Sequence, residues 1–307
     1  MKWIKQGIVF QPQPGSTWMT THAAVPCVLD TADLVRVYFT GRDPANRSHT
    51  GFFDFNPDEP SRVCSVSKDT VLSPGPLGSF DDSGAMASCV LRHQDSVYLY
   101  YIGWNLGRTV PFYNSAGLAI SRDGGLTFEK ASRGPILPRD DIDPYFTASS
   151  WVMIEGDLWR MWYLSCCRWE LDEAGQPKHY YHIKYATSHD GIHWNRTGLV
   201  SIDFQSPEEY AISRPCVIKD DDGLYRMWYS YRGERYRIGY AESTDGMRWT
   251  RKDQLAGIEP SNSGWDSEMI EYPCVFRHHG KTYMLYNGND YGETGIGLAS
   301  LAIAGLA

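Results

Sequence analysis

One structural unit recurs five times along the chain and constrains its fold more than any other feature. The clearest copy covers residues 211–251, where short runs of apolar and aromatic residues are divided by turn sequences such as Asp245-Gly246. Runs of this kind, divided by such turns, predict antiparallel β-strands. Four strands in about forty residues are what one blade of a β-propeller needs.

Two anchor residues mark each copy of the unit, one on its first strand and one on the aromatic strand that follows. The anchors are 11 residues apart in four copies and 12 in the fourth along the chain. The pairs are Cys27 and Tyr38, Cys89 and Tyr100, Trp151 and Trp162, Cys216 and Trp228, and Cys274 and Leu285. Because five such units fill the 307 residues, the sequence predicts five blades.

The third and fourth strands of the unit carry a second signature. Residues 117–124, 183–191 and 238–246 each end in Asp-Gly, and an aromatic residue follows, namely Phe128, Trp194 and Trp249. The last copy stops at residues 295–300, so we expect a segment near residues 3–10 to supply its fourth strand and close the ring. The predicted fold is therefore all-β, a five-bladed β-propeller that forms a single domain over residues 1–307.

Composition excludes several classes of protein. The longest apolar run is too short to cross a membrane, and the N-terminus lacks a secretion signal, so we expect a cytoplasmic protein without a membrane partner. A net charge of −8 disfavours nucleic acid as a partner. Four of the seven cysteines occupy equivalent blade positions, which predicts buried thiols and no disulfide, and Cys166-Cys167 lacks the spacing of a metal site. We expect no cofactor and no metal.

The repeat count, blade length and strand signatures resemble the five-bladed β-propeller superfamily of glycoside hydrolases, which includes families 32, 43, 68, 117 and 130. The resemblance implies acidic residues on the innermost strands, in a pocket at one end of the axis, acting as acid and as base or nucleophile. The Asp that invertase-like and arabinanase-like families carry on the first inner strand is absent from residues 20–26. The phrases Arg214-Pro215, Tyr272-Pro273 and Arg42-Asp43 are closer to the phosphorylase branch.

Acidic residues recur where the chain approaches each inner strand. Eight positions before the first anchor lie Met19, Asp81, Asp143, Glu208 and Asp266, and Trp18, Phe80 and Trp265 precede three of them. Carboxylates beside aromatic rings are a frequent composition of sugar sites, because a sugar offers hydroxyls to acceptors and an apolar face to a ring. The alternative is that each acid only caps a turn.

Glu271 and Arg214 are the only charged residues in their positions of the repeat. A carboxylate on an innermost strand is costly to bury unless it is paired or used. Either the two residues belong to salt bridges between blades, or Glu271 is an acid or base with a raised pKa and Arg214 holds an anionic group of the substrate. His22, near the same end of the channel, is either a structural residue or a proton-transfer group.

These patterns predict an enzyme that resembles glycoside hydrolases and acts on a small or activated glycoside or an oligosaccharide. We expect Asp82 or Asp81 to form a catalytic pair with Glu271, with Glu208 and His22 as further candidates. We expect substrate contacts from Arg214, Arg42, Asp43, Trp104, Arg232, Glu268, Trp265 and Asn289. Two alternatives stay open, namely a propeller with altered chemistry on an anionic substrate, such as a phosphorylase, lyase, isomerase or tailoring enzyme, and a carbohydrate-binding propeller without turnover.

Overall fold

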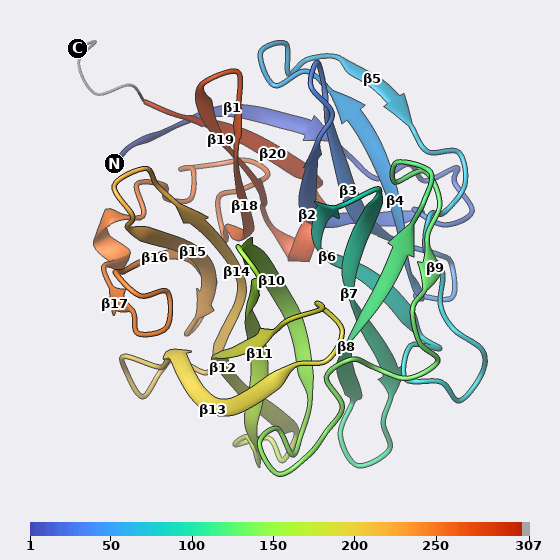
Figure 1. Ribbon diagram of the computed structural model, residues 1–307, viewed down its shortest axis with the longest axis vertical. Coiled ribbons are helices and arrows are strands. Elements are labelled where there is room, and N and C mark those ends of the chain that lie inside the picture. Colours follow the sequence, from blue (N-terminus) through green and yellow to red (C-terminus); the bar gives the residue numbers. More distant parts are fainter. Residues whose placement is uncertain (303–307) are drawn as a thin grey trace.

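Twenty strands form five four-stranded antiparallel blades around a central axis in the computed structural model, which describes residues 1–302 (Figure 1). The predicted domain limit at residue 307 lies outside these residues. Blade 1 contains β2 (Thr21–Asp30), β3 (Val35–Arg42), β4 (Ser48–Phe55) and β5 (Val63–Val66), and blade 2 contains β6 (Gly84–His93), β7 (Ser96–Leu106), β8 (Phe112–Ser121) and β9 (Glu129–Lys130). Blade 3 contains β10 (Thr147–Glu155), β11 (Leu158–Leu171), β12 (Pro177–Ser188) and β13 (Asn195–Ile202), and blade 4 contains β14 (Ala211–Lys219), β15 (Tyr225–Arg232), β16 (Tyr236–Ser243) and β17 (Thr250–Arg251). Blade 5 contains β18 (Glu271–His278), β19 (Lys281–Asn287), β20 (Ile296–Leu301) and β1 (Trp3–Phe10).

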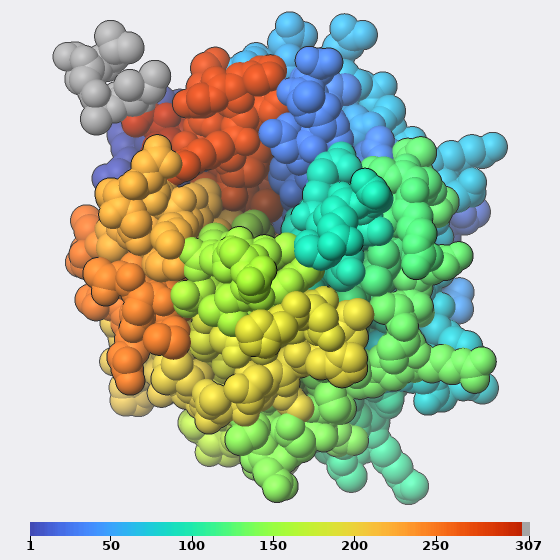
Figure 2. All heavy atoms as spheres, viewed as in Figure 1, coloured from blue at the N-terminus to red at the C-terminus, as the bar shows by residue number. Residues whose placement is uncertain are grey.

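The first strand of every blade lies innermost. In Figure 1, β2, β6, β10, β14 and β18 surround the axis, and in Figure 2 the segments of successive blades follow one another around the same centre. The ring closes where β1 pairs antiparallel with β20, as predicted. The only helices in the described part of the chain are two short 3-10 turns, Asp253–Leu255 and Asp290–Gly292, and no helix there is long and apolar enough to cross a membrane.

The anchor pairs of the repeat are direct neighbours across the first two strands of each blade. Cys27 lies opposite Tyr38, Cys89 opposite Tyr100, Trp151 opposite Trp162, Cys216 opposite Trp228 and Cys274 opposite Leu285. The constant spacing in the sequence therefore reflects a constant hairpin register. All seven cysteines are free.

The core lies between the blades, where aromatic rings from one sheet pack against the next. The anchor ring of one blade also donates a hydrogen bond to the Asp-Gly turn of the following blade. Tyr38 donates to the Gly125 carbonyl at 2.7 Å and Tyr100 to that of Gly191 at 2.8 Å. Trp162 repeats the contact, with Nε1 at 2.7 Å from the Gly246 carbonyl. The turn signature thus fastens neighbouring blades as well as reversing the chain.

The closing blade uses other contacts at this junction, because its fourth strand comes from the N-terminus and follows no Asp-Gly turn. Trp3 on β1 packs edge-on against Trp228 with ring centroids 6.0 Å apart, and its Nε1 donates to the Ala256 carbonyl at 3.0 Å. Lys5 on β1 forms an ion pair of 2.7 Å with Asp266. The N-terminal strand is therefore held by packing and by charge.

Candidate functional site

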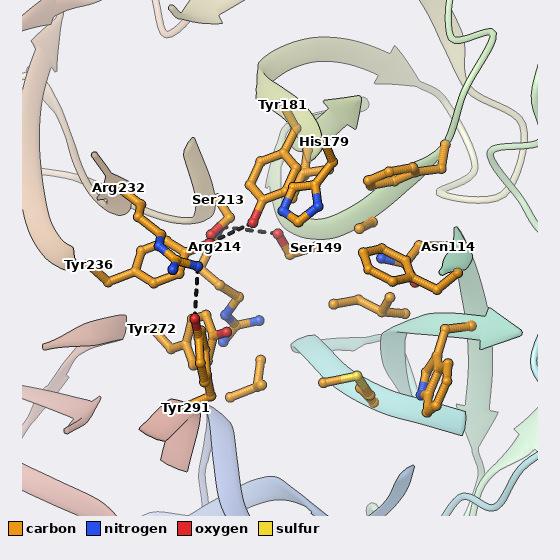
Figure 3. Close-up of a pocket in the computed structure, with 18 of the residues that line it drawn as sticks. Asn114, Ser149, His179, Tyr181, Ser213, Arg214, Arg232, Tyr236, Tyr272 and Tyr291 are labelled. Carbon is orange, nitrogen blue, oxygen red and sulfur yellow. Dashed lines mark hydrogen bonds between the residues drawn. The ribbon is translucent and has the colours of Figure 1, made fainter. Parts of the chain in front are cut away.

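A cavity of about 470 Å³ opens at the end of the axis where the inner strands begin and the second strands end (Figure 3). Residues of all five blades contribute to its wall. They are Val25, Arg42, Asn46, Met86, Ile102, Trp104, Phe112, Asn114, Phe146, Ala148, Ser149, Leu164, His179, Tyr181, Ser213, Arg214, Arg232, Tyr236, Tyr272 and Tyr291.

Irregular backbone on three inner strands shapes the floor of the cavity. Val25, Arg214 and Tyr272 have φ of 59°, 52° and 55°, in the left-handed region. The β-ladder shifts register at the same places, which is the behaviour of a β-bulge. A left-handed conformation is strained for such residues and recurs at binding sites, where it re-aims a side chain. All three side chains line the cavity.

Arg214 occupies the axis itself. It is 3% exposed, and its two terminal nitrogens donate to the Ser88 carbonyl at 2.7 Å and the Pro26 carbonyl at 2.8 Å, which belong to two other blades. No hydrogen-bond acceptor in the described residues contacts its Nε. The guanidinium therefore joins three inner strands and brings a positive charge to the floor of the cavity.

Arg232 and Arg42 bring two further guanidiniums to the wall. Arg232 donates to the Tyr291 hydroxyl at 2.8 Å, and Arg42 donates to the Asn46 side chain at 2.9 Å. Burial lowers the pKa of Arg42, whereas the hydroxyls of Tyr291 and Tyr210 help to raise that of Arg232 against the effect of burial. Within residues 1–302 none of the three cavity arginines forms an ion pair.

An aromatic wall faces these arginines. His179 stacks on Tyr181 with ring centroids 4.9 Å apart and an angle of 3°, and the Tyr181 and Tyr236 hydroxyls are 2.5 Å apart. Figure 3 shows His179 and Tyr181 side by side, with Arg232 and Tyr291 joined by their hydrogen bond. Burial, aided by the charges of Arg232 and Lys178, lowers the pKa of His179 to about 4, so the ring is neutral at pH 7.

Glu271 lies within the wall behind these residues. It is 0% exposed, and neither carboxyl oxygen has a hydrogen-bond partner among the described residues. Burial raises its pKa well above the usual value, against the opposing influence of Tyr272 and Arg232. Its charge also acts on the pKa of Tyr181, Tyr236 and Tyr272. Burial therefore favours the protonated form of the Glu271 carboxyl, which lies close enough to the tyrosines of the cavity wall to influence their pKa.

His22 lies beside the cavity and does not line it. Its Nδ1 is 2.9 Å from the Thr21 hydroxyl, and its Nε2 is 3.8 Å from the carboxylate of Glu293. Burial and then the charge of Arg42 lower the pKa of His22 to about 4. The structure thus places this ring, neutral at pH 7, one shell away from the cavity.

The acids that precede the inner strands have a different role from the predicted one. Asp81 is 2% exposed and accepts from the Lys130 ammonium at 2.6 Å and the Tyr101 hydroxyl at 3.0 Å. Asp143 binds Arg196 and Tyr163 at 2.8 Å and 2.9 Å. The same arrangement in blade 5 joins Asp266, Lys5 and Tyr286. In each case a cation from the outer strands neutralises the acid, which corrects the prediction that Asp81 acts in catalysis.

Blades 4 and 1 depart from this pattern in ways that explain the rest of the register. In blade 4 the acid that binds the tyrosine and the cation is Asp253, which follows the fourth strand instead of preceding the inner one. It binds Tyr229 and Arg251, and Arg251 also binds Glu209. Glu208 is consequently left exposed to solvent outside the cavity, which corrects its assignment as a reserve acid. Blade 1 has the apolar pair Met19 and Phe39 at the equivalent places.

Two predicted acids cap turns. The Asp82 carboxylate accepts from the Gly78 amide and the Ser83 hydroxyl, both at 2.9 Å, and it does not line the cavity. Asp43 accepts from the amides of Ala45 and Arg47, also at 2.9 Å. Both positions correct the predictions of catalytic and substrate-binding roles, because each carboxylate instead caps a turn.

Three predicted binding residues of blade 5 also lie outside the cavity. Trp265 packs on Tyr286 with centroids 5.2 Å apart, over a glycine, Gly288, where a Cβ would meet its ring at 2.5 Å. Asn289 holds the preceding loop by accepting from the Glu268 amide at 2.9 Å, and the Glu268 side chain is exposed. These contacts are structural and correct the three assignments. Of the predicted binding residues, Arg42, Trp104, Arg214 and Arg232 line the cavity.

Two curated relatives match nearly the whole chain. They are the proteins named Uncharacterized protein MT1551 and Uncharacterized protein Rv1502 from two strains of Mycobacterium tuberculosis, each 41% identical over 302 residues that cover 98% of this chain and 99% of the relative. The chain belongs to their family. No protein-family model matches the sequence.

Solved structures confirm that this family has the fold of β-propeller glycoside hydrolases. A structure named simply as a glycoside hydrolase superposes with a TM-score of 0.75 at 18% identity, covering 99% of this chain and 92% of the other. A thermostable family-43 glycoside hydrolase gives 0.65 at 14%, covering 96% and 94%. The Bombyx mori GH32 β-fructofuranosidase BmSUC1 gives 0.62 at 16%, covering 94% of this chain and 63% of the other.

Sequence analysis missed the aromatic half of the cavity of this family member. His179 and Tyr181 lie on β12, whose inner end extends beyond the repeat pattern, and Tyr291 lies in a 3-10 turn. Strand alternation over residues 178–182 could have placed His179 and Tyr181 on the same face of the strand. Which of the two faces points to the cavity depends on the position of the neighbouring blade. In the described part of the chain no three His, Cys, Asp or Glu side chains are grouped to hold a metal ion.

Proposed function

We propose that the protein is a glycoside-cleaving enzyme whose active site is the axial cavity and whose reaction involves an anionic group. The observation that carries the proposal is the charge of the cavity. Arg42, Arg214 and Arg232 line it without an ion-pair partner, and among its described lining residues none is Asp or Glu. Guanidiniums in a half-buried site are suited to carboxylate or phosphate.

The remaining wall supports a sugar as the rest of the substrate. Tyr272, Tyr291 and Trp104 offer aromatic faces, and Ser149, Ser213 and Asn114 offer hydrogen-bonding groups in the same cavity. Sugar rings use both, because their hydroxyls need polar partners and their C–H faces pack on aromatic rings. The glycoside hydrolase fold of the structural neighbours supports the same substrate class.

Glu271 is the proposed proton donor. Cleavage of a glycosidic bond needs a proton on the leaving oxygen, and a carboxyl that stays neutral at pH 7 can supply it. Glu271 meets this need because its pKa is raised by burial. We propose that Glu271, which lies behind the cavity wall, supplies the proton that the leaving oxygen takes up as its bond to the anomeric carbon breaks. Water or inorganic phosphate forms the new bond to that carbon, while the arginines bind the anionic group.

Phosphorolysis is the second candidate, and the lack of a carboxylate among the described lining residues favours it. Hydrolysis by the usual route needs a second carboxylate to activate water or to attack the anomeric carbon. A phosphate oxyanion is already a nucleophile and needs no such base. A cavity lined by three guanidiniums without an ion-pair partner, and by no carboxylate among the described residues, suits phosphate as the attacking group.

A turnover screen tests the proposal. Purified protein would be incubated with 4-nitrophenyl glycosides, uronides and sugar phosphates, with and without inorganic phosphate, beside Glu271→Gln. We expect release of nitrophenol from an anionic substrate, or phosphate-dependent release from a neutral one, and a fall of at least about a hundredfold in Glu271→Gln. Glu208→Gln is the matched control, because Glu208 is an exposed acid outside the cavity.

Two outcomes would contradict the proposal. The first is that Glu271→Gln, shown to be folded, turns over the substrate as fast as the parent. The second is that neither uronides, sugar phosphates nor added phosphate alter the signal across the panel. Dependence on phosphate would select phosphorolysis over hydrolysis.

We further propose that the protein works in the cytoplasm on a small-molecule or oligosaccharide substrate. All seven cysteines are free, which suits a reducing compartment. Fractionation of the native host cell, with detection by antibody, would test the location.

A further inference from the structure

Beside the cavity, cations and tyrosines alternate along the junction of blades 3 and 4. We define the cationic ledge by five residues, Arg168, Lys178, Tyr180, Tyr210 and Arg232. Arg168 lies 3.8 Å from the centroid of the Tyr180 ring, and Lys178 lies 4.1 Å from that of Tyr210. Arg232 lies 5.2 Å from the centroid of the Tyr210 ring. The two rings are 6.2 Å apart, so the ledge is one continuous surface.

Strand geometry explains why the ledge lies outside the cavity and yet joins it. Successive side chains of β12 point to opposite faces, so His179 and Tyr181 face the cavity while Lys178 and Tyr180 face away. Arg168 pairs with Tyr180 across β11 and β12 and shares its face. Arg232 belongs to both sites, because it lines the cavity and also lies over Tyr210.

The ledge carries excess positive charge although the whole chain is acidic, with a net charge of −8. Arg168 has an ion pair of 2.8 Å with Glu170, whose side chain is half exposed. Lys178 and Arg232 form no ion pair within residues 1–302. Tyrosine rings beside cations, two of which have no ion-pair partner among the described residues, offer a stacking face and an anion site in one place.

We propose that the cationic ledge binds an acidic oligosaccharide, the part of the substrate that extends beyond the cavity. This inference rests on the proposed function, because it takes the cavity as the reacting end of the site. The sugar rings pack on Tyr180 and Tyr210, and their carboxylates bind Lys178, Arg168 and Arg232. The repeated spacing of ring and charge favours a chain of charged sugars over a single anion.

Calorimetric titration with defined probes tests the ledge without any need for turnover. The probes are tetragalacturonate, its fully methyl-esterified form, and galacturonate monosaccharide. We expect the parent to bind tetragalacturonate at least tenfold more tightly than either of the others. Lys178→Met and Tyr180→Ala should each weaken tetragalacturonate binding about tenfold and leave galacturonate binding unchanged. Lys68→Met is the matched control, because Lys68 is an exposed lysine at the edge of blade 1.

Four results would overturn the ledge proposal. Equal affinity of the parent for tetragalacturonate and its methyl ester would remove the role of charge, and absence of binding of either compound would remove the site. Unchanged tetragalacturonate affinity in both folded ledge variants would place the binding elsewhere. Tighter binding of a hexathymidylate than of tetragalacturonate would indicate nucleic acid. Failure of the proposed function would give a different result from failure of the ledge. In that case Arg232→Met would leave galacturonate affinity unchanged, and the turnover screen would show no product.

Discussion

Two sets of buried charges in this propeller differ in whether they repeat. Asp81, Asp143 and Asp266 recur at one position of the blade, and each is matched by a tyrosine and a cation of the same blade. Glu271 and Arg214 have no charged counterpart in the other blades. The repeated acids are neutralised and join the strands of their own blade, whereas the unrepeated groups lack an ion-pair partner and lie at the cavity or directly behind its wall.

The difference has an energetic basis. A buried ion pair in which every oxygen is hydrogen-bonded is tolerated, but the removal of one partner leaves an uncompensated charge. A buried carboxyl without partners avoids this cost by staying protonated. We therefore expect substitution of the neutralised acids to lower the free energy of unfolding. We expect substitution of the groups without an ion-pair partner to affect mainly ligand binding and catalysis. Four predictions test this contrast, from the largest effect to the smallest.

Removal of a neutralised acid should cause the largest loss of stability. Asp143→Ala leaves Lys184 buried without a carboxylate and Arg196 with only that of Asp140, so we expect the free energy of unfolding to fall by about 3 to 5 kcal/mol in urea titration. Hydrogen bonds from Ser165 and Lys184 hold the Asp143 pKa below its usual 3.8 despite burial. Its stabilisation is therefore present above pH 4 and lost as pH falls through the folded pKa. Glu208→Ala should change nothing, and a loss below 1 kcal/mol in Asp143→Ala would break the contrast.

The ring closure should be the next most sensitive place. Lys5→Met removes the cation of Asp266 and leaves that carboxylate with the Tyr286 hydroxyl, at 3.0 Å. We expect a loss of about 2 kcal/mol in the free energy of unfolding, measured by urea titration. Lys2→Met, at an exposed lysine of the same terminus, is the control. Equal stability of the two variants would show that packing alone closes the ring.

Glu271→Gln should change how stability depends on pH. The folded pKa of Glu271 is raised above its ordinary 4.5, so the neutral carboxyl contributes stability that is present below pH 4.5 and lost as pH rises through the folded pKa. Across that window the parent should lose up to about 1.4 kcal/mol per pH unit relative to Glu271→Gln. Thermal unfolding from pH 4 to pH 9 measures the difference. Parallel curves would show that Glu271 has found a partner.

Arg232→Met should have the smallest effect on the unliganded protein. Its guanidinium has no acid partner, so we expect unfolding in plain buffer to change by less than about 0.5 kcal/mol. Inorganic phosphate at ten times its dissociation constant should stabilise the parent by about 1.4 kcal/mol and this variant much less. Arg277→Met, at a surface arginine, should respond as the parent does. Equal phosphate effects in Arg232→Met and the parent would remove Arg232 from the anion site.

Much of the fold could be predicted because its strands and turns recur at regular spacings along the sequence. The anchor residues Cys89 and Tyr100 are direct cross-strand partners, and the Asp-Gly turns occur where the sequence places them. The acids Asp81 and Asp266 lie in equivalent places, as their spacing indicated, but the spacing did not show that each is neutralised by a cation of its own blade. The cations that neutralise them, Lys130 and Lys5, come from fourth strands and, in blade 5, from the opposite end of the chain.

The sequence by itself determined the repeat, the number of blades, the closing strand and the two charged residues that break the pattern, because each depends on spacing along the chain. Only the tertiary structure decided which acids are neutralised and which side chains share the cavity. The first depends on contacts between strands of one blade that are distant in the sequence, and the second depends on distances between blades. Tyr181 and Tyr236 are 55 residues apart in sequence and 2.5 Å apart at their hydroxyls. Burial of this kind arises when the ring closes, and no single blade contains the information.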